Sequence, residues 1–251
     1  MTAQKKIYTR KEFEELRVES AKAMHSDNEL HNKAIEVLTR AHHYNWIHQS
    51  TWFGEPILNL PQDMFALQEI IFKTKPKYIV EVGVAWGGSL LFYSTIMEMI
   101  GGESIIGINI FIPDDLRERI NEHGKIAKRI SLINGSSIED STLTQVKSII
   151  KDSREVMIIL DSHHTHEHVL EELRLYSTLV GKGHYLICGD TIIEDISEPE
   201  HRMREWGHGN NPKTALVEFM KENDRFIEDK RIQNKLLFTC NPGGYLMCDK
   251  D

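Results

Sequence analysis

Residues 77–89 read KYIVEVGVAWGGS, and this stretch decides the fold. It opens with an almost continuous apolar run, which is typical of a β-strand buried on both faces. Gly83, Gly87 and Gly88 then predict a tight turn at which the backbone can approach a ligand closely. A helix is expected over 88–99. Its N-terminus would direct free N–H groups and the positive end of the helix dipole toward a ligand at the glycine turn. A strand, a glycine loop and a helix in this order predict a parallel sheet covered by helices.

Downstream of this unit, apolar runs and helical patterns keep alternating. Strands are expected over 104–110, 130–135, 157–161 and 183–190, and helices over 114–123, 138–150, 166–179 and 213–222. This alternation predicts a parallel sheet with helices on both faces. Residues 235–240 and 245–248, joined by the turn NPGG, predict a closing antiparallel hairpin. The whole order predicts an α/β, Rossmann-like class I methyltransferase sheet of seven strands, mostly parallel. A plain dinucleotide-binding fold usually ends on a parallel strand instead.

Upstream of the glycine loop, the pattern is helical. Apolar residues recur at helical spacing over 9–48, a loop with two prolines covers 49–61, and a short helix over 62–74 ends before Pro76. We therefore expect an N-terminal helical extension and cap over 1–61, and a methyltransferase domain over 62–251.

Composition excludes several classes of protein. The chain has 251 residues and a formal net charge of −8, which disfavours a general binder of nucleic acid or anionic membranes. Neither an apolar signal segment at the N-terminus nor a run of about 20 apolar residues is found. Cys188, Cys240 and Cys248 lie in apolar runs, as expected of buried reduced thiols. These features together predict a cytoplasmic location.

The glycine loop, EVGVAWGGS at 81–89, carries the first indication of a ligand. It matches neither GxGxxG nor GxxxxGK[ST], which disfavours a nicotinamide or a nucleoside triphosphate. Glu81, at the end of the strand, suits a ligand with a positive group, such as the amino acid end of S-adenosylmethionine. A purely structural tight turn is the alternative interpretation.

Two further positions bear on that ligand. The second strand should end with an acid that binds ribose hydroxyls, but here it ends with Asn109. Asp114 and Asp115 are the candidates to replace it. After the third strand, NGSS at 134–137 includes Ser136, at a place where contacts to an adenine edge are usually made. A capped helix start explains NGSS equally well.

Acids and histidines gather in ILDSHHTHEH, residues 159–168. Asp161 ends the fourth strand and Asp190 ends the fifth, so neighbouring strands would bring their carboxylates about 4.8 Å apart. Such a pair suits a hard cation such as Mg²⁺. Zinc is the less favoured alternative, because HExxH is absent.

His164 stands above the sheet, three residues after Asp161. An imidazole with a pKa near 6.5 can accept a hydroxyl proton at neutral pH, so His164 is the candidate general base. His163, His166 and His168 are the other histidines of this segment. The interpretation that competes with a role in the site is that each is a solvated loop or helix-cap residue.

Five segments together carry a resemblance to a known family. They are EVGVAWGGS, LDSHHTHEHVLEELRLYSTLV, GHYLICGDTIIED, WGHGNNPKTALVEF and NKLLFTCNPGGYL, which match in order over about residues 50–248. The chain resembles the family called cephalosporin hydroxylase, better described as S-adenosylmethionine-dependent O-methyltransferases. This family is similar to rhamnosyl and macrolide-sugar O-methyltransferases, and many members are encoded beside lipopolysaccharide or capsule genes. A facial iron site that would support hydroxylation is not found.

The resemblance implies roles for single residues. His164 and Asp161 match catalytic positions, and Asp161 and Asp190 match metal-binding carboxylates. The related metal site often has an acidic pair at the fifth strand, whereas Gly189 precedes Asp190 here. A third carboxylate ligand is therefore either missing or supplied from elsewhere, with Glu194 and Asp195 as the candidates. The residues predicted to contact the cofactor are Glu81, Gly83, Gly87, Ser89, Asn109, Ser136 and Asp161.

We therefore expect a Mg²⁺-dependent O-methyltransferase that acts on a sugar or glycan precursor of lipopolysaccharide, capsule or a glycosylated metabolite. Alternatives are a non-sugar acceptor such as a capsular phosphate derivative or an antibiotic intermediate, a nicotinamide oxidoreductase, and a non-catalytic partner subunit. Trp52, Phe53 and the long loop 191–212 with Trp206 are expected to cover the site. For Trp52 and Trp206, ordinary packing is the competing interpretation. The N-terminal helices are available for packing in a homo-oligomer.

Overall fold

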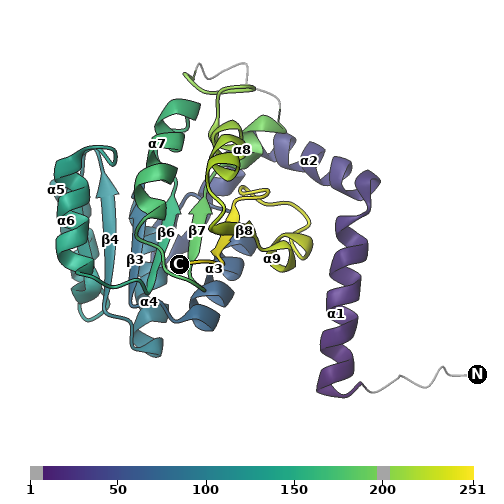
Figure 1. The fold of residues 1–251 in the computed structure, drawn as a ribbon, viewed down its shortest axis with the longest axis horizontal. Coiled ribbons are helices and arrows are strands. Elements are labelled where there is room, and N and C mark those ends of the chain that lie inside the picture. Colours follow the sequence, from purple (N-terminus) through teal and green to yellow (C-terminus); the bar gives the residue numbers. More distant parts are fainter. Residues whose placement is uncertain (1–7, 197–203) are drawn as a thin grey trace, which may run out of the picture.

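The computed structural model describes residues 8–196 and 204–251. Its centre is a seven-stranded sheet with the order β5-β4-β3-β6-β7-β9-β8 (Figure 1). The five parallel strands are β3 (Tyr78–Val82), β4 (Ser104–Asn109), β5 (Ile130–Asn134), β6 (Val156–Leu160) and β7 (Tyr185–Cys188). β9 (Tyr245–Cys248) and β8 (Phe226–Glu228) close the sheet with antiparallel pairs. The predicted mixed, mostly parallel sheet is confirmed.

Alternate residues of each strand point to opposite faces, and each face has its own core. Val80 and Val82 belong to one core, while Ile79 belongs to the other. The first face is covered by α6 (Asp140–Ile150), α7 (His166–Ser177) and α8 (Pro212–Glu222). The second is covered by α3 (Pro61–Thr74), α4 (Gly88–Ile100) and α5 (Asp114–Glu122). The central strands are buried throughout, which explains their continuous apolar runs.

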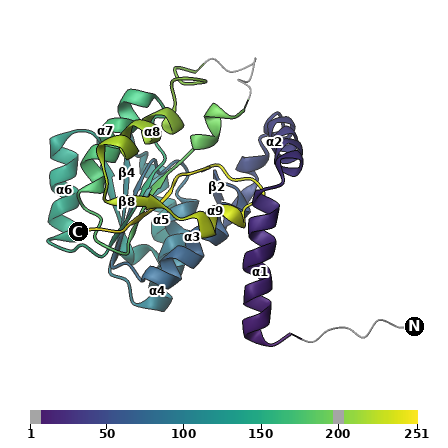
Figure 2. The ribbon, with the colours of Figure 1, turned by 45° about the vertical axis from the view of Figure 1, so that its right-hand side comes forward.

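The predicted helical region at 9–48 contains two α-helices. α1 (Arg10–His25) begins at a capping box between Thr9 and Glu12, and α2 (Asn28–His42) begins where Asp27 accepts a hydrogen bond from Leu30 N–H. A 3₁₀ turn, η1 (Trp46–His48), follows. α1 buries no residue, and it lies beside α9 (Lys230–Asn234) (Figure 2). α2 packs on the body through Ala34 and Leu38. The division into 1–61 and 62–251 stays a prediction.

The predicted C-terminal hairpin is wrong in one strand. Residues 235–240 form no strand, and β9 pairs instead with β7 on one side and with β8 on the other. β8 is followed by α9 (Lys230–Asn234). Leu236 and Cys240 lie in a loop, and both side chains are buried, which accounts for the apolar pattern. A short apolar run does not distinguish a strand from such a segment.

A small hairpin also lies where a loop was expected, formed by β1 (Ser50–Trp52) and β2 (Glu55–Ile57). Phe53 and Gly54 turn it with φ values of 50° and 93°. No helix within residues 8–196 and 204–251 combines the length and the apolar character that crossing a membrane needs.

β3 and β6 are neighbours although β4 and β5 lie between them in sequence, so the chain changes direction across the sheet at this pair. Ligands of open α/β sheets bind at such a point. Gly83 lies there with φ +94°, and a Cβ on it would stand 1.8 Å from the carbonyl oxygen of Asp161. Only glycine fits so close to the β6 backbone.

Gly83→Ala should therefore cost more stability than the same change at another left-handed glycine. Gly101 is the matched control, because its φ is +79° but a Cβ there meets nothing within 4 Å. We expect Gly101→Ala to cost about 1–2 kcal/mol from its backbone conformation alone, and Gly83→Ala roughly 2 kcal/mol more from the collision. Urea unfolding of the two variants measures the difference, and equal losses would contradict the collision.

Candidate active site

A cavity of about 680 Å³ opens at the carboxyl ends of the parallel strands. Its lining includes Gly83 after β3, Asn109 at the end of β4, Ser136 after β5 and Asp161 after β6. This volume is in the range of small-molecule sites. Four of the predicted cofactor residues are thus brought together at one place.

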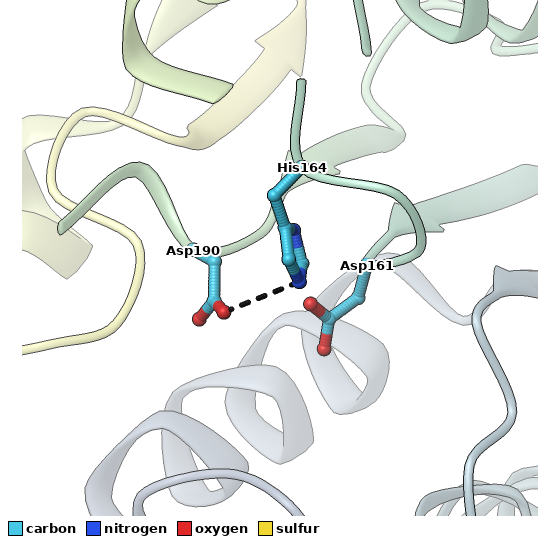
Figure 3. A group of neighbouring side chains, drawn as sticks. All are labelled: Asp161, His164 and Asp190. Atoms are coloured by element: carbon cyan, nitrogen blue, oxygen red, sulfur yellow. Dashed lines mark ion pairs between the residues drawn. The ribbon is translucent and has the colours of Figure 1, made fainter. Parts of the chain in front are cut away.

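Asp161, His164 and Asp190 form a group beside this cavity. Asp161 directly follows β6 and Asp190 lies just beyond β7, and the two strands pair in parallel. One ligand atom from each of the three residues lies within 4.8 Å of the others. Figure 3 shows the imidazole of His164 between the two carboxylates, with its Nε2 3.5 Å from Asp190 Oδ2. The two predicted metal ligands and the predicted base therefore face one another.

Burial and mutual repulsion govern the protonation of this group. Burial raises the pKa of Asp161 well above its usual range, and the charges of Asp190, Glu81 and Glu172 raise that pKa further. Burial lowers the pKa of His164, although Asp190 and Glu172 oppose the effect. His164 is thus a neutral imidazole at neutral pH. The pair of carboxylates is the donor set that a hard divalent cation takes, because a cation relieves the repulsion between them.

Gly189 explains why an acidic pair is absent at the fifth strand. A Cβ at this position would lie 2.7 Å from the Leu160 carbonyl oxygen and 3.0 Å from Asp161 Oδ1. A longer side chain would therefore displace the carboxylate that it was meant to assist. The third candidate ligand in the described group is His164.

The predicted substitutes, Glu194 and Asp195, do not join the group. Glu194 accepts hydrogen bonds from Gly209 N–H at 2.9 Å and from the Asn211 side chain. Asp195 is exposed.

Glu81 lies below the glycine loop. Its side chain is buried and accepts a hydrogen bond from Ser89 Oγ at 2.8 Å. Burial raises the pKa of Glu81 to about 7, while hydrogen bonds from Ser89 and Tyr93 act to lower it. Glu81, Ser89, Gly83 and Asp161 line a small cavity of about 30 Å³. Such a volume suits one small polar group.

Gly87 lines neither cavity. It is the N-cap residue of α4, with φ +83°, and a Cβ on it would meet the side chains of Ile120 and Leu116. Asn109 is held in place on both sides: its Oδ1 accepts from Val84 N–H at 3.3 Å and its Nδ2 donates to the Phe111 carbonyl at 2.7 Å. The amide thus ties the ends of β3 and β4 together.

The other three histidines of the segment 159–168 each lie near a carboxylate. His163 Nε2 lies 3.4 Å from Glu205, and His166 Nε2 lies 3.3 Å from Glu218. His168 Nε2 lies 3.1 Å from Glu172, which is fully buried.

Glu172 also accepts hydrogen bonds from Ser137 and Ser162. It thereby links the loops that follow β5 and β6. Sequence reasoning missed this residue, because an acid on an amphipathic helix carries no signal of burial.

Of the two tryptophans expected to cover the site, one lines the cavity and the other does not. Trp206 lines the cavity, and its ring lies edge-on to His164 with 5.1 Å between ring centroids. Trp52 does not line it: its indole N–H donates to Thr95 Oγ1 and its ring packs on Phe92. Residues 197–203 of the predicted cover lie outside the described residues.

The predicted N-terminal extension supplies one wall of the cavity, which we call the α2 wall. Its residues in the lining are Leu38, Thr39, His42, Ile47, His48 and Leu58. The sequence predicts a cap from this region and names Trp52 and Phe53 for it, but neither lines the cavity and none of these six residues was singled out. These contacts join segments that are distant in the chain, and a helical pattern alone does not reveal its partner.

The sheet order, the glycine loop and the site at the β3/β6 edge define a class I, S-adenosylmethionine-dependent methyltransferase. Solved structures share the fold: CmcI in its apo form has a TM-score of 0.55 at 20% identity, covering 81% of this chain and 78% of that one. A CmcI structure with Mg and SAM has a TM-score of 0.53 at 20% identity, covering 80% and 77%.

The sequence then gives the family. Residues 44–248 match the model described as Rhamnosyl O-methyltransferase/CmcI, so the chain belongs to this family. The rhamnosyl O-methyltransferase of Mycobacterium tuberculosis is 26% identical over 202 residues, which cover 79% of this chain and 78% of that protein. Its counterpart in Mycobacterium leprae is 27% identical over 200 residues, covering 79% and 82%. The predicted family and enzyme class are confirmed.

Glu81 gives the stability of the protein a defined pH dependence. Its pKa is about 7 when folded and 4.5 ordinarily, so the folded state holds the proton more tightly than the unfolded state. Its contribution is complete below about pH 4.5 and is lost as the pH rises through about 7, a change of roughly 3 kcal/mol.

Glu81→Gln cannot ionise and should lose this component. Urea unfolding at about pH 5 and about pH 8 should show a fall in stability that is smaller in the variant than in the wild type by up to roughly 3 kcal/mol. Parallel pH dependences of the two proteins would contradict the assignment.

Proposed function

We propose that the protein transfers a methyl group from S-adenosylmethionine to a hydroxyl of a sugar or glycan precursor, with Mg²⁺ held by Asp161 and Asp190. The observation that carries this proposal is the meeting of these carboxylates with His164 beside the glycine loop. The names of the relatives support a sugar acceptor, and the CmcI structure with Mg and SAM supports the cofactor and the metal. A part in lipopolysaccharide or capsule synthesis and a cytoplasmic location belong to the proposal.

Two sets of residues would bind different parts of the cofactor. Glu81, Ser89 and Asp161 surround the small cavity and suit the cofactor's ammonium group, since a cation stabilises the ionised form of Glu81. Asn109 and Ser136 line the large cavity, where ribose and adenine would lie. Asn109 offers no charge, and its amide is already engaged by the neighbouring backbone.

The chemistry is a displacement at carbon. S-adenosylmethionine supplies an electrophilic methyl on a sulfonium, and Mg²⁺ supplies positive charge that favours an ionised hydroxyl. The acceptor oxygen forms a bond to the methyl carbon while the carbon–sulfur bond breaks, leaving its electron pair on sulfur. His164 Nε2 takes the hydroxyl proton, which its neutral state permits. Trp206 and the α2 wall limit the access of water to this reaction.

Asp161→Ala should abolish metal-dependent turnover while the fold is retained. Asp195→Ala is the matched control, because Asp195 is an exposed acid near the site but outside the group. Turnover is measured as a gain of about 14 Da, one transferred methyl, on candidate nucleotide sugars and glycans. Full activity of the wild type in EDTA would refute the metal's role.

The same assay tests the acceptor and the catalytic role. A mass gain only on non-sugar acceptors would correct the substrate class, and failure to bind S-adenosylmethionine would favour a non-catalytic subunit.

His164→Ala tests the base separately from the metal. As a base, His164 contributes about 10²–10⁴-fold to kcat, and its loss should leave the affinity for S-adenosylmethionine and the Mg²⁺ activation constant near those of the wild type. Steady-state kinetics and calorimetry measure these quantities. A large rise in the Mg²⁺ activation constant would instead make His164 a metal ligand, and a loss of cofactor binding would exclude both roles.

A further inference from the structure

Asp63, on the first turn of α3, is a fully buried acid outside the cavity lining. Its Oδ1 accepts hydrogen bonds from Tyr245 OH at 2.7 Å and from Thr239 Oγ1. Its Oδ2 accepts from Cys240 N–H at 2.8 Å. Three donors from one C-terminal segment thus converge on a carboxylate that lies far away in the sequence. A buried carboxylate is costly unless it is satisfied in this way.

The segment that Asp63 holds in turn holds the loop that carries Asp190. Cys240 O accepts from Ile192 N–H at 3.0 Å, and Asn241 Oδ1 accepts from Asp190 N–H at 3.1 Å. The carbonyl oxygen of Pro242 accepts a hydrogen bond from Thr191 Oγ1 at 3.0 Å. Residues 239–242 therefore fix the backbone on both sides of the carboxylate.

A continuous path joins the two acids. Thr239 Oγ1 donates to Asp63 and accepts from Asn241 N–H at 3.0 Å, and the Asn241 side chain accepts from Asp190 N–H. Every link is a hydrogen bond between groups that are at least partly buried. Loss of the acceptor at Asp63 would therefore be transmitted to Asn241, and from there to Asp190.

Asp190 needs such support because its backbone is left-handed, with φ 51° and ψ 26°. A residue with a side chain keeps this conformation only where its surroundings enforce it. The conformation directs the carboxylate of Asp190 toward His164 (Figure 3).

We propose that Asp63 is a positioning residue for the cation site: it holds residues 239–242, which hold Asp190 in the conformation that faces Asp161. The inference rests on the proposed function, since it takes Asp190 as a metal ligand. Asp63 itself touches neither metal nor substrate.

Asp229 offers a matched control. It is a buried acid that accepts a hydrogen bond from a buried tyrosine, Tyr185 OH, at 2.6 Å. Its other side-chain partner is Arg231, and within the described part of the chain the Asp229 carboxylate makes no hydrogen bond to residues 239–242. Loss of a buried acid should thus destabilise the fold in both variants, but should weaken the cation site only in Asp63→Asn.

The experiment measures Mn²⁺ binding to the full chain by electron paramagnetic resonance. Asp63→Asn should weaken Mn²⁺ binding about ten-fold or more, whereas Asp229→Asn should stay within about two-fold of the wild type. S-adenosylhomocysteine binding without metal should be unchanged in both. In assays, the Mg²⁺ activation constant of Asp63→Asn should rise while kcat at saturating Mg²⁺ stays near that of the wild type.

Tyr245→Phe keeps the proposal testable if Asp63→Asn does not fold, because it removes only one donor to Asp63; Tyr185→Phe is its control. Tyr245→Phe should weaken Mn²⁺ binding several-fold, about three-fold or more, relative to Tyr185→Phe. Unchanged Mn²⁺ affinity in Asp63→Asn, or in Tyr245→Phe if that is the variant that folds, would overturn the positioning role and leave the metal site standing. An equal loss in the Asp229→Asn control would overturn it as well. Absence of Mn²⁺ binding by the wild type would overturn the metal site and this inference together.

Discussion

Acidic side chains crowd the place where β3, β6 and β7 end, and the fold has to keep them there against their mutual repulsion. Burial, together with the charges of Asp190, Glu81 and Glu172, raises the pKa of Asp161 well above its ordinary value. Each of these acids could be solvated on a surface loop at little cost. A cation bound between Asp161 and Asp190 would offset the repulsion that arises when these acids are held together in a cavity.

Backbone geometry makes this crowding feasible. At Gly83 the glycine loop passes so close to the Asp161 carbonyl that no side chain fits, and at Gly189 the same is true beside Leu160 and Asp161. The glycines therefore act in this chain by bringing strand ends together, and the acid expected at 189 would have spoiled the site. The cost of the left-handed Asp190 is met by contacts with residues 239–242 rather than by a local turn.

The sequence predicted best what depends on strand order and local pattern. The run at 77–89 indicates a buried parallel strand and its glycine turn, and the position of Asp161 and Asp190 at strand ends predicts their meeting, because adjacent parallel strands end at one edge. It predicted poorly what depends on packing between distant segments. Residues 235–240 were expected to pair as a strand but are a buried loop tied to Asp63. Trp52 was expected over the site but packs on α4, and the α2 wall carried no residue-level signal.

The central claim is that Asp161 and Asp190 share one divalent cation. The most direct measurement is anomalous diffraction from crystals grown with Mn²⁺ and S-adenosylhomocysteine. The account predicts an anomalous peak between the two carboxylates, at about 2.0–2.3 Å from an oxygen of each. A well-ordered cavity with no peak there, or a peak held by other residues, would contradict it.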